Sequence, residues 1–406
     1  MVNEQPAELL VVGAGPAGLT AALAARSLGI DVTLIEADPQ DRERAGSRAL
    51  FVHHETLNRL QRLSPGLGDK IAGFGITWEY ARTFYGDREV YSRRYTSSPG
   101  VGLPPYASLR QLDTERFLRD ACQGAGVRAV WDAAVEEVRS GPEDVTVRTR
   151  DGREWTSDYL IAADGARSTV RTRMGIEMDG DRSDDYRIAV DLADDPANHG
   201  SAECVMYYRH PALDGRNVLV VPFAGGIQAD VQCRGREDSE RLSTPEAVRR
   251  WIPQVVPAGY RDRVLWIARY PCLQRVATSF VDRHRRVLLT GEAAHLFAPL
   301  GARGMNSAMA DAESASTAVG VALRAAGSER ARAAVEEFDR LRRQAAHHNR
   351  ARVERAVRHL RADSPVQRLR QAGAARLAPL LPGAGAWLHR APYGPRGSVT
   401  VTTGLY

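Results

Sequence analysis

The sequence predicts an α/β protein with a Rossmann-like dinucleotide-binding domain, an inserted and mainly antiparallel β-sheet, and a C-terminal helical segment. Three observations predict this fold. A strand, glycine loop, helix and strand open the chain, five strand-like segments follow between residues 186 and 273, and an apolar strand with a glycine-rich loop returns at residues 285–306. At 406 residues the chain exceeds the usual size of one hydrophobic core, so more than one domain is expected.

The opening segment, "ELLVVGAGPAGLTAALAARSLGIDVTLIEAD", carries a dinucleotide fingerprint. An apolar run ends before Gly13, Gly15 and Gly18 in G-x-G-x-x-G spacing, and a second strand ends at Glu36. The glycines permit a tight turn, close approach of backbone to a pyrophosphate, and close packing of helix on strand. Glu36 can bind ribose hydroxyls and would repel a 2′-phosphate. NAD and FAD share the adenosine diphosphate half, so the fingerprint alone does not choose between them.

Two later segments add to this domain. "DYLIAADGARSTVR" is a strand that ends at Asp164 and Gly165, and "RRVLLTGEAAHLFAPLGARGMN" runs from a strand through Glu292 into a glycine-rich loop. A helix that opens after such a loop leaves backbone N–H groups free, which suits a ligand with partial negative charge. No second G-x-G-x-x-G follows a strand in the sequence, so no dedicated nicotinamide-binding half is expected.

The inserted sheet is predicted from "YRIAVDLADD", "AECVMYYRHP", "RNVLVVPFAG", "IQADVQCRGR" and "RVLWIARYPCL", several of which alternate apolar and polar residues. Ligand pockets favour domain junctions, so this sheet would form the roof of a substrate pocket. The candidate pocket residues, each of which could equally be an ordinary strand residue, are Tyr207, Arg209, Phe223, Gln228 and Tyr270. The expected domain limits are 1–175 and 281–325 for the dinucleotide-binding domain, 176–280 for the inserted sheet and 326–406 for the C-terminal helical region.

Composition excludes other classes of protein. No apolar run reaches the ~18 residues of a membrane span, and the N-terminus lacks the basic start of a signal peptide, so a cytoplasmic location is expected. The four cysteines form no CxxC pair, which argues against a zinc site, any other metal site or a disulfide scaffold. Residues 324–396 hold sixteen arginines against six acids, which we interpret as solvated helix faces and not as a nucleic-acid site, because aromatic residues do not alternate with the arginines. The oligomeric state stays open.

The motifs "GAGPAG" with Glu36, "ADGARSTVR" and "GEAAHLFAPLGARGMN" together resemble the flavin-dependent aromatic hydroxylases of the para-hydroxybenzoate hydroxylase type, over about residues 7–320. "GSRALFVHHETLNRL" and "SLRQLDTERFLRDA" add a softer similarity. The resemblance implies non-covalent FAD. Its adenosine diphosphate half would be held by Gly13, Gly15, Gly18 and Glu36, its pyrophosphate and ribityl chain would run along Arg48 and Gln111, and Asp164 and Gly165 would lie near the flavin and the nicotinamide approach.

The resemblance also assigns the third motif. The Gly-Asp of the family is Gly291-Glu292 here, so Glu292 would meet the ribityl chain with one more methylene. Backbone N–H groups of Gly304, Met305 and Asn306 would point at the pyrimidine edge of the flavin, where a helix N-terminus favours negative charge. Gly304 is expected to need a positive φ, and the backbone at Pro299 would border the reacting ring.

Three histidines near these motifs are weaker candidates. We interpret His295 as a packing residue of the motif turn in preference to a catalytic acid or base. His53 and His54 could approach the flavin, and the sequence does not rank them.

The activity implied by the resemblance is that of an FAD-dependent monooxygenase with NADH or NADPH as a transient reductant and O2 as co-substrate. It would hydroxylate a phenolic, polyketide or indole-like small molecule through a flavin hydroperoxide. The alternatives are an FAD-dependent epoxidase or reductase of a lipophilic substrate, and a non-catalytic, FAD-stabilised protein that binds a partner. A halogenase is disfavoured, because only "RRWIP" at residues 249–253 approximates the W-x-W-x-I-P motif.

Overall fold

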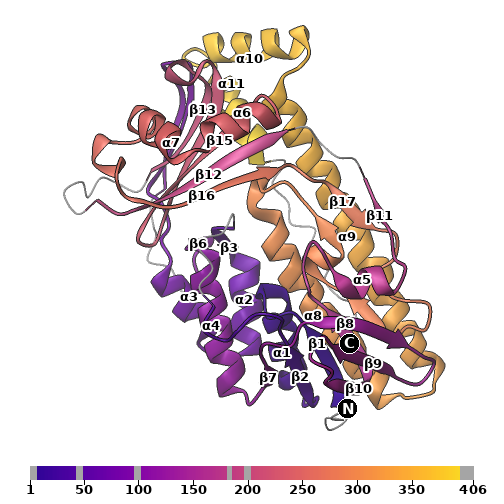
Figure 1. The fold of residues 1–406 in the computed structure, drawn as a ribbon. Helices are drawn as coiled ribbons and strands as arrows, with labels where there is room; N and C mark the ends of the chain where they lie inside the picture. The colour runs from indigo at the N-terminus through magenta and orange to yellow at the C-terminus, as the bar shows by residue number, and fades with distance from the viewer. Residues whose placement is uncertain (1–6, 43–48, 96–101, 181–184, 196–202, 394–406) are drawn as a thin grey trace.

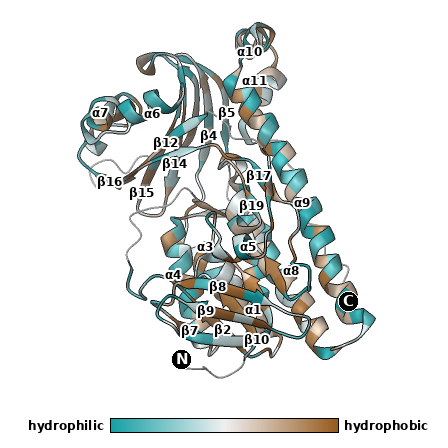
Figure 2. Ribbon diagram, turned by 45° about the vertical axis from the view of Figure 1, so that its right-hand side comes forward, coloured by the Kyte–Doolittle hydropathy of each residue, from teal (hydrophilic) through white to brown (hydrophobic). Residues whose placement is uncertain are grey.

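The computed structural model describes residues 7–42, 49–95, 102–180, 185–195 and 203–393. Figure 1 shows two lobes joined along one side by a long helix, α9 (Glu329–Arg361). The N-terminal strands lie in the lower lobe, and a second sheet with the last helices lies in the upper lobe. The hydrophobic residues of the lower lobe gather around its sheet (Figure 2).

The lower lobe is built on a seven-stranded sheet of order β7-β2-β1-β10-β9-β8, with β18 paired to β10. Pairing is parallel among β7, β2, β1, β10 and β18, and antiparallel along β10, β9 and β8. The strands are β1 (Ala7–Val12), β2 (Val32–Ile35), β7 (Arg128–Val130), β8 (Val135–Ser140), β9 (Val145–Thr149), β10 (Glu154–Ala162) and β18 (Val287–Leu289).

Local sequence explains the start of this lobe. The apolar run of β1 is typical of a parallel strand covered on both faces. Helix α1 (Pro16–Ser27) begins directly after Gly15, and its proline occupies a first-turn position where no backbone donor is needed. Helix α1 packs against α4 (Gln111–Gly124) and α8 (Arg303–Arg324), so the Rossmann-like prediction is confirmed.

The upper lobe contains a second seven-stranded sheet of order β16-β12-β15-β14-β13-β4-β5. All of its pairs are antiparallel except β13 with β4. The five predicted strands are confirmed as β12 (Tyr186–Ala193), β13 (Glu203–His210), β14 (Arg216–Phe223), β15 (Gly226–Cys233) and β16 (Val264–Pro271). The edge hairpin of β4 (Tyr80–Tyr85) and β5 (Arg88–Arg94) was not predicted, and it comes from within residues 1–175. The sheet is therefore assembled from two separate chain segments, and the domain limits stay a prediction.

The two faces of the upper sheet differ in character. On β12, Ile188, Val190 and Leu192 belong to a hydrophobic core that also contains residues of α6 (Arg236–Leu242) and α7 (Pro245–Trp251). Successive strand residues alternate between faces, so Arg187, Ala189 and Asp191 point to the other side, toward the lower lobe. The polar face of the sheet thus covers the top of the nucleotide-binding lobe.

The C-terminal region is helical, as predicted, and its longest helix, α9, is rich in arginine. Helix α9 begins after Ser328, whose hydroxyl accepts a hydrogen bond from Ala331 N at 3.3 Å, and it packs along α8. Helices α10 (Pro365–Leu377) and α11 (Pro382–Arg390) follow, and α11 packs on β4 and β5. Within the described ranges, no helix is long and apolar enough to cross a membrane.

The remaining elements are short connections. They are β3 (Phe51–His53), β6 (Tyr106–Ser108), β11 (Met178–Asp179), β17 (Arg275–Ala277), β19 (His295–Leu296), α2 (His54–Leu63), α3 (Leu67–Phe74) and α5 (Thr169–Arg173).

Candidate functional site

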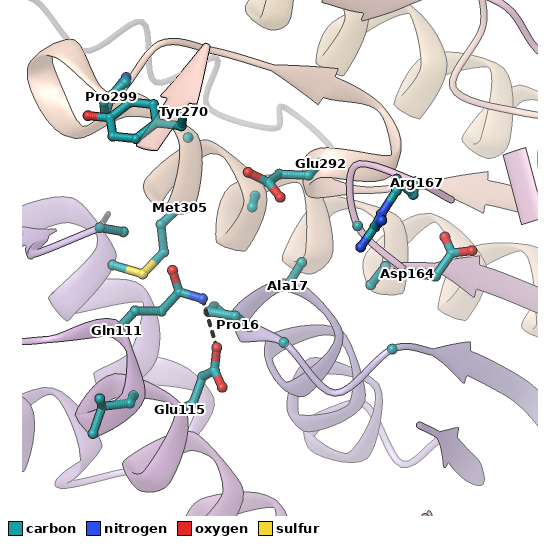
Figure 3. Close-up of a pocket in the computed structure, with 18 of the residues that line it drawn as sticks. Pro16, Ala17, Gln111, Glu115, Asp164, Arg167, Tyr270, Glu292, Pro299 and Met305 are labelled. Atoms are coloured by element: carbon teal, nitrogen blue, oxygen red, sulfur yellow. Dashed lines mark hydrogen bonds between the residues drawn. The ribbon is translucent and has the colours of Figure 1, made fainter. Parts of the chain in front are cut away.

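A cavity of about 1270 Å³ lies between the two lobes. It is larger than the ~300–1,000 Å³ of ordinary ligand pockets, so it has room for more than one ligand. Its floor comes from the turn after β1, the end of β2, the start of α4, the turn after β10 and the start of α8, and its roof comes from the upper sheet. Figure 3 shows residues of both parts facing one another.

The β1–α1 turn is shaped by its glycines. A Cβ atom at Gly13, where φ is +104°, would lie 2.4 Å from the Ala163 carbonyl oxygen, and one at Gly18 would collide with the Gly13 carbonyl. A Cβ atom at Gly15 would meet no described atom within 4 Å, and Gly15 lines the cavity. Gly13 and Gly18 are therefore needed for packing within the protein, whereas Gly15 leaves space on the cavity side.

Glu36 lies directly after β2, as the fingerprint predicts. It is 7% exposed, and its carboxylate accepts hydrogen bonds from Ala14 N at 2.5 Å and from Asp38 N at 3.0 Å. Arg42 Nη1 lies 3.6 Å from Glu36 Oε1 and also lines the cavity. The carboxylate is thus fixed at the edge of the floor, where a ribose would approach. The other residue expected near the pyrophosphate, Arg48, lies outside the described residues.

The start of α4 and the β10–α5 turn face the cavity from opposite sides (Figure 3). Gln111 Nε2 donates to Glu115 Oε1 at 2.7 Å, and both residues line the cavity. Asp164 accepts from Ser168 Oγ at 2.5 Å and from Val170 N at 3.0 Å, so its carboxylate caps α5. Burial raises the pKa of Asp164 despite these hydrogen bonds. Gly165, next to it, lines the cavity at a φ of +79°.

The third motif forms the far end of the floor. Glu292, Pro299, Gly304 and Met305 all line the cavity, and among the described residues no side chain caps the N-terminus of α8. The expected positive φ at Gly304 is wrong, because Gly304 already lies inside the helix. The left-handed turn comes earlier, at Gly301 with a φ of +73° and at Ala302 with a φ of +52°.

Asn306, expected beside the flavin, does not line the cavity. Its side chain joins the start of α8 to β3: Nδ2 donates to Phe51 O and Ala302 O, both at 2.8 Å, and Oδ1 accepts from His53 N at 2.9 Å. Burial and the nearby Arg303 lower the pKa of His53 to about 4, so His53 is neutral near pH 7. Neither His53 nor His54 lines the cavity.

His295 is a buried structural residue, as interpreted from the sequence. Its Nε2 lies 2.6 Å from Asp311 Oδ2, and its ring stacks on Phe297 with centroids 4.5 Å apart. Asp311 also accepts from Arg342 Nε at 2.7 Å and from Gly291 N at 3.2 Å. Burial raises the pKa of Asp311, but Arg342 and His295 outweigh it and the net shift is downward. This buried carboxylate therefore connects α8, α9 and the turn that carries Glu292.

The roof contains two of the five residues proposed for it. Gln228 and Tyr270 line the cavity, whereas Tyr207, Arg209 and Phe223 do not. Tyr207 packs against the core on the other face of the sheet, Arg209 is exposed, and Phe223 is buried in a small cluster with Leu50.

The prediction missed the charged residues of the roof. Arg187 and Asp230 line the cavity as a buried ion pair, and Tyr270 Oη donates to Asp230 Oδ2 at 2.5 Å. A sequence signal existed: each charge stands next to apolar residues inside a predicted strand, in "YRIAV" and "QADVQ".

The floor fits an FAD molecule on its own geometry. Two helices, α1 and α8, present to the cavity N-termini that no side chain caps within the described part of the chain, and Gly15 leaves open space beside one of them. Uncapped helix N-termini favour anionic groups such as a pyrophosphate. Glu36 supplies the carboxylate that a ribose needs.

Comparisons with known proteins agree with this geometry. The FAD binding domain family matches residues 6–350. The chain is 30% identical over 318 residues to 6-methylpretetramide 4-monooxygenase of Streptomyces rimosus, which covers 75% of this chain and 54% of that protein. It is 28% identical over 318 residues to a 3-(3-hydroxy-phenyl)propionate/3-hydroxycinnamic acid hydroxylase of Mycolicibacterium gilvum, with 77% and 53% covered. The chain spans about half the length of these two relatives.

The fold is also that of solved structures. The structure of p-nitrophenol 4-monooxygenase from Pseudomonas putida DLL-E4 matches 98% of this chain and 100% of that chain, with a TM-score of 0.77 at 22% identity. At this identity the match shows the fold alone. The family match covers most of the sequence and includes every floor residue described above, so the chain belongs to the FAD-binding domain family.

Proposed function

We propose that the chain is an FAD-dependent monooxygenase that uses NADH or NADPH and O2 to hydroxylate an aromatic small molecule of phenolic, polyketide or indole-like type. One observation carries the proposal: the dinucleotide floor and the polar face of the inserted sheet enclose a single cavity. A cofactor on the floor and an acceptor under the roof would therefore share one space. Both relatives above are named for oxygen insertion, one as a monooxygenase and one as a hydroxylase.

The floor residues would bind and orient the cofactor. The N–H groups at the start of α1 and the open side of Gly15 would receive the pyrophosphate, and Glu36 would accept hydrogen bonds from the ribose. The N–H groups at the start of α8, near Gly304 and Met305, would face the flavin ring. A helix N-terminus stabilises negative charge there by about 0.3–1 kcal/mol.

The residues above the floor would hold the acceptor and exclude water. Pro299 and Phe297 line the cavity between the floor and the roof, and Leu219 and Val221 give the roof an apolar part. When bound, FAD supplies the redox chemistry, taking reducing equivalents from the nicotinamide and activating O2. Because the chain has one dinucleotide fingerprint, the nicotinamide would bind only transiently.

Isotope labelling tests this proposal. The FAD-loaded protein is incubated with NADH or NADPH and a panel of phenols, naphthols and indoles under isotopically labelled O2. The masses of the products are then measured by mass spectrometry. We expect one labelled oxygen atom in the product, faster NAD(P)H oxidation when the acceptor is present, and release of free FAD on denaturation. Product oxygen from water, or turnover that persists without O2, would contradict the proposal and favour the reductase alternative. A bound flavin that NAD(P)H does not bleach would favour the non-catalytic one.

A further inference from the structure

The roof of the cavity consists of three cross-strand rows on the polar face of β12, β15 and β16. At one end Arg187 pairs across from Tyr270, and at the other end Asp191 pairs across from Gln228 on one side and Trp266 on the other. Between these ends Ala189 pairs across from Ala268 on β16 and from Asp230 on β15. Residues 187 and 191 are ~13 Å apart along the strand. The roof therefore has a polar group at each end, and Asp230 stands in its middle row.

The first polar end is an ion pair in which the cation, Arg187, already contacts the carboxylate of Asp230. Arg187 is 3% exposed, its Nε donates to Asp230 Oδ1 at 2.5 Å, and its Nη2 contacts the same oxygen. Tyr270 donates to the other oxygen of Asp230. Asp230 is thus held by a guanidinium and a phenol, and the positive charge of Arg187 is balanced inside the wall. An incoming carboxylate would approach this cation only beside an existing carboxylate.

The second polar end is a carboxyl group with one unused oxygen. Asp191 is 1% exposed, and its Oδ1 accepts from Gln228 Nε2 at 2.7 Å. Its Oδ2 is buried and has no hydrogen-bond partner among the described residues. Burial raises the pKa of Asp191 to about 6, although Gln228 and Arg110 act to lower it. Asp191 itself does not line the cavity, but it lies in the same cross-strand row as Gln228 and Trp266, which both do, so the unused acceptor lies in the roof beside the cavity lining.

The charges of the roof do not favour an anion. Two carboxyl groups, Asp191 and Asp230, stand against the buried guanidinium of Arg187. Arg110 also acts on Asp191, but its Nε lies 3.4 Å from Asp113 Oδ2, so its charge is shared with another carboxylate. Arg269 also lines the cavity, but its Nη1 donates to Glu240 Oε1 at 2.8 Å. Glu240 belongs to α6, which packs on the other face of the sheet. Like charges that lie close together repel near a protein surface, and leaving a buried acceptor unpaired costs free energy. A ligand with a hydrogen-bond donor pairs the buried acceptor, and a ligand without charge avoids the repulsion.

We propose that the roof selects an uncharged aromatic compound that carries a hydrogen-bond donor, and rejects the same ring system when it carries a carboxylate. The inference rests on the proposed function for the identity of the cavity. It narrows the acceptor to neutral phenols and related hydroxylated ring systems, with a hydroxyl or amide N–H directed at Asp191.

A matched pair of ligands tests the selection. 6-Hydroxy-2-naphthamide and 6-hydroxy-2-naphthoate share their rings and hydroxyl group and differ only in the charge of one substituent. Each is titrated into the FAD-loaded protein at about pH 8, where Asp191 is ionised, and the dissociation constant is read from the change in flavin absorbance. We expect the amide to bind at least about tenfold more tightly than the acid, a difference of about 1.4 kcal/mol.

Variants locate the source of the preference. Asp191→Asn removes one negative charge without changing the side-chain shape, so the preference for the amide should fall severalfold. Asp230→Asn leaves Arg187 without its counter-ion and should turn the preference toward the acid, provided the variant folds. Asp262→Asn removes the same charge from a side chain that is 80% exposed, so its preference should equal that of the unmodified protein.

The outcomes separate this inference from the proposed function. Equal or tighter binding of the acid, a preference unchanged by Asp191→Asn, or no binding of either compound would overturn the inference. These readings need no turnover. An amide preference without any oxygenated product would instead overturn the proposed function and leave the selectivity of the roof intact.

Discussion

The floor and the roof of the cavity are built in different ways. The floor around the β1–α1 turn is made mainly of backbone. At its centre, Gly15 has no side chain and leaves open space on the cavity side. The roof is made of side chains, and its charges come from strands up to about eighty residues apart, β12 and β16. A backbone surface can hold only one kind of ligand at that point, whereas a side-chain surface can be changed one residue at a time. If the proposed function holds, the floor would fix the cofactor and the roof would set the acceptor.

The largest expected effect breaks the floor. Gly15→Val should weaken FAD binding by at least about 100-fold, because the added side chain fills the space beside the helix N-terminus that a pyrophosphate needs. The protein itself should still fold, since Gly15 has an extended backbone and its Cβ would meet no described atom within 4 Å. Flavin retained on purification and the melting temperature of the flavin-free protein measure the two effects.

Two matched variants sharpen this test. Gly73→Val adds the same side chain in open space on α3, away from the cavity lining, and should retain FAD. Gly18→Val should lose the fold itself, because its Cβ would collide with the Gly13 carbonyl. Full FAD occupancy in Gly15→Val would show that the pyrophosphate does not lie at this turn.

The second effect concerns the support beneath the floor. Asp311→Ala should lower the free energy of unfolding by about 3–5 kcal/mol, because it leaves Arg342 buried without its partner carboxylate. It should also weaken FAD binding, since Asp311 holds the Gly291 turn that carries Glu292. Urea unfolding and flavin titration measure the two losses.

Its control is an ion pair on the surface of α9. Glu337→Gln breaks a contact to Arg340, which is 59% exposed, and should change stability by less than about 1 kcal/mol. Equal losses in the two variants would remove Asp311 from the support of the floor.

The smallest effect concerns the roof. The pKa of Asp191 is raised from 3.8 to about 6 in the folded protein, so the folded state binds the proton more tightly than the unfolded chain. The stability that this group contributes is therefore present at low pH and lost as pH rises from about 4 to about 6. Asp191→Asn stays neutral at every pH, so it should exceed the unmodified protein in stability by up to about 3 kcal/mol above pH 6.

This stability difference should vanish toward about pH 4, where both side chains are neutral. Urea unfolding at several pH values, without added ligand, measures it. A difference that does not depend on pH would mean that Asp191 is ionised normally in the folded protein.

The floor could be predicted from the sequence better than the roof, because the floor is built from local backbone turns and the roof from side chains of distant strands. The fold, the five strands β12 to β16 of the upper sheet and the floor residues Gly15 and Glu36 could be predicted, because backbone turns require glycine at fixed spacing and strands require alternating or continuous apolar runs. Gln111 was predicted only from the family resemblance. The hairpin strands β4 and β5 could not be predicted as part of this sheet, since nothing local to residues 80–94 indicates which sheet they join.

The roof shows the limit of the same reasoning. Tyr207 and Tyr270 are both tyrosines on strands of one sheet, yet only Tyr270 lines the cavity. Which face a residue occupies depends on the phase of its strand, and which faces meet depends on pairing between distant segments. Asp191, Arg187 and Asp230 acquire their roles only through that pairing. The prediction of a positive φ at Gly304 failed for a different reason. The left-handed turn that the loop requires is made earlier, at Gly301 and Ala302.

The order of the strands has a consequence for how the protein folds as it is synthesised. β10 pairs with β18, more than a hundred residues later, and β4 pairs with β13 at a similar separation. Neither sheet can be completed until most of the chain has left the ribosome, so the β4–β5 hairpin waits with an unpaired edge. Contacts of such long sequence separation slow folding, and exposed strand edges promote association between chains. Expression yield should therefore depend on chaperones and temperature more than the stability of the finished fold would suggest.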